Sequence, residues 1–134
     1  MRESLINKSD LPASARITSP AISLVRARTV SVTFRVTFPA SGAGNCTGEV
    51  FYSADGLNFD TIPFGTVTIT LTAGAAVQLT AVVVPPEHGQ LKFAVLNSNA
   101  NPVTDVRAWY SVQSWEATDK TPAVGTLERN YGDL

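Results

Sequence analysis

The stretch TVSVTFRVTF, residues 29–38, predicts an amphipathic strand more strongly than any other part of the chain. Apolar residues, all β-branched or aromatic, alternate in it with polar ones. The apolar set is Val30, Val32, Phe34, Val36 and Phe38. Because successive side chains of a strand point to opposite faces, this alternation predicts one buried face and one face in water.

Similar segments recur along the chain and are separated by turns rich in Gly, Pro and Asn. Further strands are predicted over residues 21–25, 46–53, 66–71, 76–84, 90–96 and 103–115. No ten-residue window shows helical spacing of apolar residues. Seven or eight strands that each bury one face must form two sheets packed against each other. The predicted fold is therefore all-β, an antiparallel β-sandwich of the jelly-roll or immunoglobulin-like kind.

Both ends of the chain lack this alternation. Residues 1–20 contain Pro12 and Pro20 and are predicted to form an extended N-terminal arm. The sandwich is assigned to residues 21–116 and an extended C-terminal tail to residues 117–134. Residues 1–28 hold five basic and two acidic residues, whereas residues 116–134 hold four acidic and two basic ones. Each end therefore either meets a neighbour of complementary charge or is simply solvated.

Composition limits the classes of function. The chain has 134 residues, 44% hydrophobic and 16% charged, which favours one folded domain. A net charge of -1 argues against a broad surface for nucleic acid or anionic membranes. No apolar run approaches the roughly 18 residues of a membrane span, and the first residues lack a secretory h-region. The protein is therefore expected to be made in a cytoplasm.

No catalytic or cofactor-binding constellation is visible. His88 is the only histidine and falls in a predicted turn, PPEHGQ. Cys46 is the only cysteine, so it forms no intrachain disulfide, and we expect it to be a small buried hydrophobe. Phosphate-binding glycine loops, CxxC pairs and HExxH are missing. We therefore predict no catalytic residue, no metal, no cofactor and no enzymatic activity.

The stretch YSADGLNFD, residues 52–60, has the character of a turn. Asp55-Gly56 lies between two predicted strands, and Gly accepts positive φ at little cost. A calcium loop is the sharper alternative, but Asp55, Asn58 and Asp60 offer fewer than the six to eight oxygens that calcium takes. The motif residues are Tyr52, Ser53, Asp55, Gly56 and Phe59. They resemble the Y-S-x-D-G-x-x-W/F stretch of discoidin-type β-sandwich domains, some of which bind carbohydrate, and also the Asp-box turn of sialidases. In those families the motif is chiefly structural.

The last predicted strand carries both tryptophans. If Val106 and Ala108 point inward, Arg107, Trp109 and Trp115 share the outer face. Large aromatic side chains on a nominally wet face suggest an interface. A bulge that buries one of them, or cover by the chain's own tail, would also explain the pattern. The Thr-rich outer faces elsewhere carry few charges, and another subunit is one way to cover such edge strands.

The stretch VFYSADGLNFDT…LKFAVLNSNANPVTDVRAWYSVQSWE, within residues 46–116, resembles small structural proteins of tailed-phage virions. Among these, capsid decoration (cement) proteins fit best. The resemblance implies a homotrimer that binds the major capsid protein on the outer capsid surface and clasps its neighbours with terminal arms. Arg16 and Tyr131, in the two arms, then join Trp109, Trp115 and Arg107 as candidate interface residues. The alternatives are a tail, baseplate or head-fibre component, or a carbohydrate-binding module with a groove near Tyr52, Phe59 or Trp109.

Overall fold

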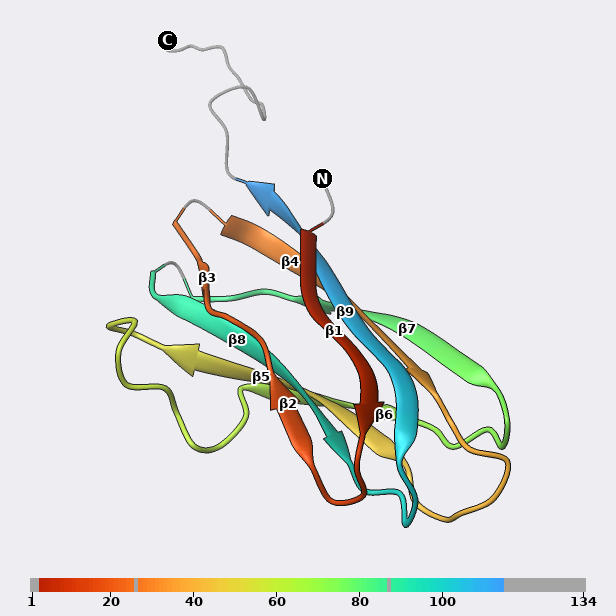
Figure 1. The fold of residues 1–134 in the computed structure, drawn as a ribbon. Helices are drawn as coiled ribbons and strands as arrows, with labels where there is room; N and C mark the ends of the chain where they lie inside the picture. Colours follow the sequence, from red (N-terminus) through yellow and green to blue (C-terminus); the bar gives the residue numbers. More distant parts are fainter. Residues whose placement is uncertain (1–2, 26, 87, 115–134) are drawn as a thin grey trace, which may run out of the picture.

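The computed structural model describes residues 3–25, 27–86 and 88–114, which form two packed antiparallel β-sheets (Figure 1). Sheet A has the strand order β1 (Glu3–Leu11), β9 (Val103–Ser114), β4 (Ala27–Thr37) and β7 (Ala76–Val83). In sheet B, β2 (Arg16–Thr18) and β3 (Ile22–Ser23) both pair with β8 (Gln90–Asn97), followed by β5 (Cys46–Ser53) and β6 (Gly65–Ile69). The described residues contain no helix. The predicted all-β antiparallel sandwich is confirmed.

The path of the chain between the sheets is that of a jelly roll. Apart from β2–β3 and β5–β6, every connection leads from one sheet to the other. Strands far apart in the sequence therefore become neighbours, as β1 and β9 do in sheet A and β2 and β8 do in sheet B (Figure 1). Of the two architectures that the sequence left open, this strand order selects the jelly roll.

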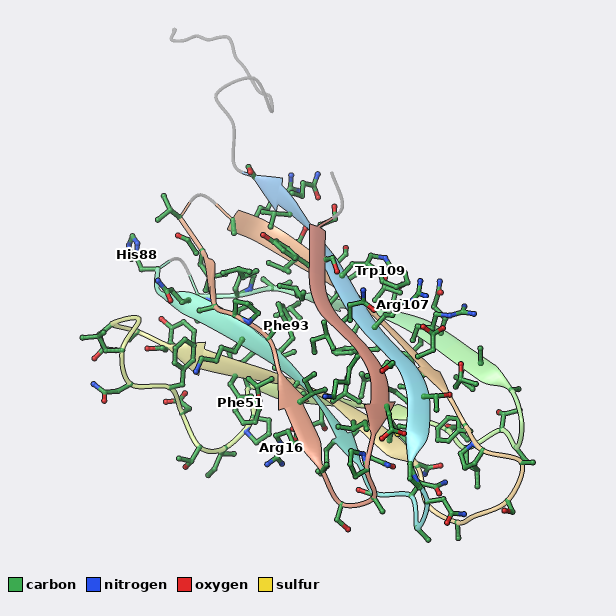
Figure 2. The ribbon with its side chains drawn as sticks, in the orientation of Figure 1. Arg16, Phe51, His88, Phe93, Arg107 and Trp109 are labelled. Atoms are coloured by element: carbon green, nitrogen blue, oxygen red, sulfur yellow. The ribbon has the colours of Figure 1, made fainter. Side chains whose placement is uncertain are left out.

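The core lies between the sheets and contains the alternating residues that decided the fold. The apolar residues of the 29–38 stretch are at most 2% exposed, and Phe93 of β8 faces them from sheet B (Figure 2). Other fully buried contributors are Cys46, Ile69, Leu91, Val95, Val103, Val106 and Ala108. In and beside β6, Ile69 is buried, and Val67 and Leu71 are half-buried. Burial of this apolar surface is the main stabilising term of the fold.

Residues 3–18 differ from the predicted extended arm, because they supply strands β1 and β2 of the sandwich. β1 lies at the edge of sheet A. From Ser4 to Leu11, Ile6 and Leu11 are its buried residues, and its register with β9 shifts between Ser4 and Ile6. An irregular edge strand that buries two residues five positions apart shows no period of two. These two strands bring the count to nine. The predicted C-terminal tail, residues 117–134, lies outside the described residues.

A buried asparagine joins two loops at one end of the sandwich. Asn97 closes β8, is fully buried, and donates from Nδ2 to the carbonyl oxygens of Leu11, Pro12 and Asn101, each at 3.1 Å. Its Oδ1 accepts the Asn99 backbone N–H at 2.8 Å. A buried amide without partners is costly, so separating these groups would be unfavourable. The bonds therefore hold the end of β1 close to the start of β9.

The two sheets pack tightly against each other at Gly48. A Cβ atom at this position would lie 2.7 Å from the ring of Phe34, which is fully buried. The φ of Gly48 is not in the positive range, so its backbone conformation does not require glycine. Glycine is required there because a side chain would have no room. The Phe34 ring fills the place that a side chain on β5 would take.

We expect Gly48→Ala to destabilise the protein by about 1–3 kcal/mol, because a methyl group would displace the Phe34 ring in a close-packed core. Urea unfolding would measure the difference. Gly65→Ala is the matched control, because a Cβ at Gly65 meets nothing within 4 Å. Equal stability of the two variants would contradict the tight contact.

Candidate functional site

A row of polar side chains crosses the outer face of sheet A. Asn7 of β1 pairs with Arg107 of β9, Arg107 with Arg35 of β4, and Arg35 with Gln78 of β7. Two residues further along β9, Trp109 pairs with Ser4 of β1. Val106 and Ala108 are fully buried. Arg107 and Trp109, which alternate with them along β9, therefore face outward, as the alternation predicts.

These side chains line a cleft of about 410 Å³. Its lining residues are Ser4, Asn7, Arg35, Gln78, Asp105, Arg107 and Trp109. Figure 2 shows Trp109 and Arg107 side by side on the outer side of sheet A, on the opposite side of the sandwich from Arg16 and Phe51. The half-buried Trp109 supplies the large apolar surface, and the remaining lining residues are polar or charged. The cleft therefore combines one aromatic plane with a dense set of hydrogen-bonding groups.

Asp105 holds the two arginines together. Its Oδ1 accepts a 2.7 Å hydrogen bond from Arg107 Nε, and its Oδ2 lies 3.6 Å from Arg35 Nε. Arg35 Nη1 also donates to Gln78 Oε1 at 3.4 Å. The three charged side chains are 37–52% exposed, so these pairs are screened and each adds little to stability. Two guanidinium groups share one carboxylate, and the cluster carries one excess positive charge.

The backbone conformation at Asp105 is unusual. Its φ is 50°, a left-handed conformation that costs a non-glycine residue roughly 1–2 kcal/mol. The register between β4 and β9 shifts at this point, between Arg35 and Thr37. The bulge places the Asp105 carboxylate beside the directly paired Arg35 and Arg107, whose like charges would otherwise repel. Strained backbone and like-charge pairs concentrate at functional sites, which supports this cluster as the candidate site.

The predicted turn motif forms a turn, on the other side of the molecule. Asp55 Oδ1 accepts the backbone N–H groups of Leu57 and Asn58 at 2.8 Å and the Ser53 hydroxyl at 2.9 Å. Gly56 has φ 79°, the value that favours glycine there. Hydrogen bonds hold the pKa of the Asp55 carboxyl far below its usual range. The largest contribution comes from the backbone N–H and then the side chain of Asn58, followed by Leu57 and Ser53. The carboxylate is therefore engaged by its own loop.

The calcium alternative gains no support from this geometry. Both oxygens of Asp55 accept hydrogen bonds from the loop, Oδ2 from Asn58 Nδ2 at 2.9 Å. Among the described residues, no three His, Cys, Asp or Glu side chains gather closely enough to hold a metal ion. The aromatic residues of the motif are engaged as well: the Tyr52 hydroxyl donates to the His88 carbonyl at 2.7 Å, and Lys92 Nζ lies 4.1 Å from the centre of the Phe59 ring.

One candidate interface residue lies apart from the cleft, and two others fall outside the described residues. Arg16 lies on sheet B, where its Nε bonds to Glu49 Oε1 at 2.7 Å, and this hydrogen bond raises the pKa of the guanidinium. Trp115 and Tyr131 lie outside the described residues. Of the five residues proposed for an interface, the structure therefore brings together Arg107 and Trp109.

Cys46 and His88 occupy the positions that their sequence context indicates. Cys46 is fully buried, and burial raises the pKa of its thiol to about 11, so the thiol stays protonated at neutral pH and is a poor nucleophile. His88 is exposed in the β7–β8 loop (Figure 2). None of the described residues belongs to a helix long and apolar enough to cross a membrane.

Sequence reasoning missed most of the cleft, namely Ser4, Asn7, Arg35, Gln78 and Asp105. One signal was present: Arg35 is the only charged residue on the polar face of the 29–38 stretch. Its meaning depends on its neighbours across the sheet, and the strand order supplies them.

No protein-family model matches the chain, and no curated protein matches it by sequence. Among solved structures, one similar fold is found in a family GH115 4-O-methyl-α-glucuronidase with specificity for decorated arabinogalactans, at 10% identity and a TM-score of 0.50. The match covers 84% of this chain but 16% of the glucuronidase, so the chain spans a small part of that enzyme. At this identity the likeness concerns the fold alone.

Two smaller structures also overlap the chain. The C-terminal CBM6 of LamC from Zobellia galactanivorans has 8% identity and a TM-score of 0.49, with 83% of this chain and 91% of that chain covered. A carbohydrate binding module from Cellvibrio mixtus lichenase 5A, solved with cellotriose, has 12% identity and a TM-score of 0.48, with coverages of 84% and 91%.

We expect Asp55→Ala to lower the melting temperature at pH 7, because the loop loses its hydrogen-bond acceptor. Since the pKa of Asp55 is depressed in the folded state, its contribution is complete above the ordinary aspartate pKa of about 4 and is lost as the pH falls further. The gap between variant and wild type should therefore shrink below about pH 4. Thermal melts from pH 7 to pH 2 would measure it.

Asp60→Ala in the same loop is the control, since the hydrogen bond that Asp60 makes there uses its backbone N–H, to the Tyr52 carbonyl. A gap for Asp55→Ala that stayed constant down to pH 2 would contradict the role of the carboxylate.

Proposed function

We propose that this β-sandwich is a non-catalytic binding domain that takes a carbohydrate into the cleft on the outer face of sheet A. The observation that carries the proposal is the position of Trp109 beside the Arg35–Asp105–Arg107 cluster, within one cleft. Of the three aromatic residues considered for a groove, Trp109 is the one that lines this cleft. Tyr52 and Phe59 are engaged on the sheet B side.

The chemistry of a sugar suits such a cleft. A pyranose ring presents C–H groups on one face, which pack on an aromatic plane, and hydroxyl groups around its rim. Guanidinium, carboxylate and amide groups are planar and can donate to, or accept from, adjacent hydroxyls. Residues two apart on one face of a strand lie about 7 Å apart, so Trp109 and Arg107 are spaced on the scale of one sugar ring. The aromatic plane and the polar cluster can thus contact the same saccharide.

We expect Trp109→Ala to weaken glycan binding by at least about tenfold, because the variant removes the apolar wall of the cleft. Isothermal titration or NMR titration with cello-, xylo-, laminari- and galacturono-oligosaccharides would measure the affinity. Trp109→Phe should retain part of the binding, since it keeps an aromatic ring.

Phe59→Ala is the control for the other face, because Phe59 packs on Lys92 of sheet B. If Phe59→Ala lost glycan binding while Trp109→Ala kept it, the site would lie on sheet B instead. Failure of the wild-type chain to bind any of these glycans would refute the proposed function.

A second candidate function, a structural protein that assembles through a sheet edge, is favoured by one further observation. Residues 61–86 include no charged residue, and this segment supplies both β6 and β7. β6 ends sheet B and β7 ends sheet A, and the two strands flank an apolar slot of about 130 Å³. Val82 and Val84 beside it are 66% and 72% exposed. Edge strands usually carry charge or cover that prevents pairing with other chains, and this edge carries no charge.

Self-association through this edge would suit the interpretation of the chain as a capsid decoration protein. That interpretation, with a homotrimer, a major capsid protein as partner and a place on the virion surface, stays a prediction. A tail, baseplate or head-fibre component would use the same kind of edge. The two candidate functions use different surfaces, so they can be tested separately.

We expect Val82→Lys to reduce the native mass of a self-associated full-length chain to that of a monomer, because it puts a charge on the apolar edge. Analytical ultracentrifugation at several concentrations would measure the mass. Ser9→Lys is the control, since it adds the same charge to an exposed position on β1, at the opposite edge of sheet A. A wild-type chain that stays monomeric at all concentrations would remove the support for assembly.

A further inference from the structure

We infer that the saccharide bound in the cleft carries an anionic group, a carboxylate as in a uronic acid or a sulfate ester. This inference rests on the proposed function and specifies its ligand. The first observation is the charge of the cleft: Arg35 and Arg107 line it together with a single carboxylate, Asp105. The excess positive charge is local, because the chain as a whole has a net charge of -1.

The second observation concerns the free donors of the arginines. A guanidinium has five N–H donors in a planar fork. Within the described residues, Arg107 bonds to Asp105 through Nε, and its two terminal nitrogens make no hydrogen bond to the protein. Arg107 is also the more exposed of the two arginines, at 52% against 37%. Its terminal nitrogens can therefore pair with a ligand anion through two parallel hydrogen bonds.

The third observation is the electrostatic conflict that the fold maintains. Arg35 and Arg107 face each other directly across β4 and β9, an arrangement of like charges that is unfavourable in a sheet. One carboxylate, placed by a residue in the left-handed conformation, offsets part of this repulsion. A second anion beside Arg107 would offset the remainder, whereas a neutral sugar would leave it. An anionic group next to the ring that packs on Trp109 thus satisfies the cleft better than a hydroxyl does.

The test compares anionic saccharides with a neutral one. Tetragalacturonate and its fully methyl-esterified form share one sugar chain, so the ester is the neutral reference, and a sulfated carrageenan tetrasaccharide supplies sulfate as the anion on a different sugar chain. Titration of the full-length chain at low salt should show at least about tenfold tighter binding of an anionic form than of the methyl ester. The preference should shrink as the salt concentration rises. Whichever anion is preferred identifies the source of the charge.

Two arginine variants locate the effect. Arg107→Gln should remove most of the preference for the anionic form, and Arg35→Gln is the second variant in case the first fails to fold. Lys8→Gln removes one positive charge from β1, outside the cleft, and should keep the preference. Loss of the preference in Lys8→Gln as well would overturn the inference, because the effect would then come from overall charge.

The remaining outcomes separate this inference from the proposed function. Equal binding of the methyl ester and the anionic forms, or binding of neutral cello-, xylo- or laminari-oligosaccharides alone, would overturn the anionic ligand and leave carbohydrate binding intact. Failure of all these glycans to bind would overturn both.

Discussion

The amide of Asn97 is the interaction on which the cleft depends, although it lies outside the cleft. It is fully buried at the end of β8, and its donors hold carbonyl groups of Leu11, at the end of β1, and Asn101, before β9. A buried amide has no water to replace these partners, so the bonds constrain where the two strands meet. The register that runs from this junction sets Asn7 beside Arg107, and beyond a shift between Ile6 and Ser4 it is Ser4 that lies beside Trp109. A residue of sheet B thereby shapes the binding surface of sheet A.

The two outer faces of the sandwich differ in how their polar groups are used. On sheet B, Arg16 is paired with the buried Glu49, and the loop after β5 folds on itself around Asp55 and packs Phe59 against Lys92. These groups are satisfied within the chain. On sheet A, two arginines share one carboxylate, and donors remain directed toward a cleft beside Trp109. Recognition of a ligand needs polar groups that are positioned but not fully satisfied, which is why the candidate site lies on sheet A.

The local pattern of residues predicted where the strands lie in the sequence better than it predicted which strands pair. The 29–38 stretch and the segment 46–53 were recognised because β-branched and aromatic residues that alternate with polar ones fit a half-buried strand. β1 was missed because an edge strand with a bulge buries few residues at irregular spacing. Trp109 and Arg107 were identified from the same alternation, whereas Arg35 and Asp105 were not. Their role comes from pairing between β4 and β9, which lie some 70 residues apart in the sequence.

The sequence by itself determined that the chain forms an all-β sandwich, that the apolar residues of the 29–38 stretch enter the core, and that Asp55 and Gly56 make a turn. These properties follow from side-chain periodicity and backbone preference, which act over a few neighbouring residues. The tertiary structure alone decided the jelly-roll order, the place of β1, and the meeting of Arg35, Asp105 and Arg107 beside Trp109. Contacts between distant strands depend on which sheets the chain crosses and in what register. Local periodicity does not encode that information, because it specifies which face of a strand is buried and not which other strand lies beside it.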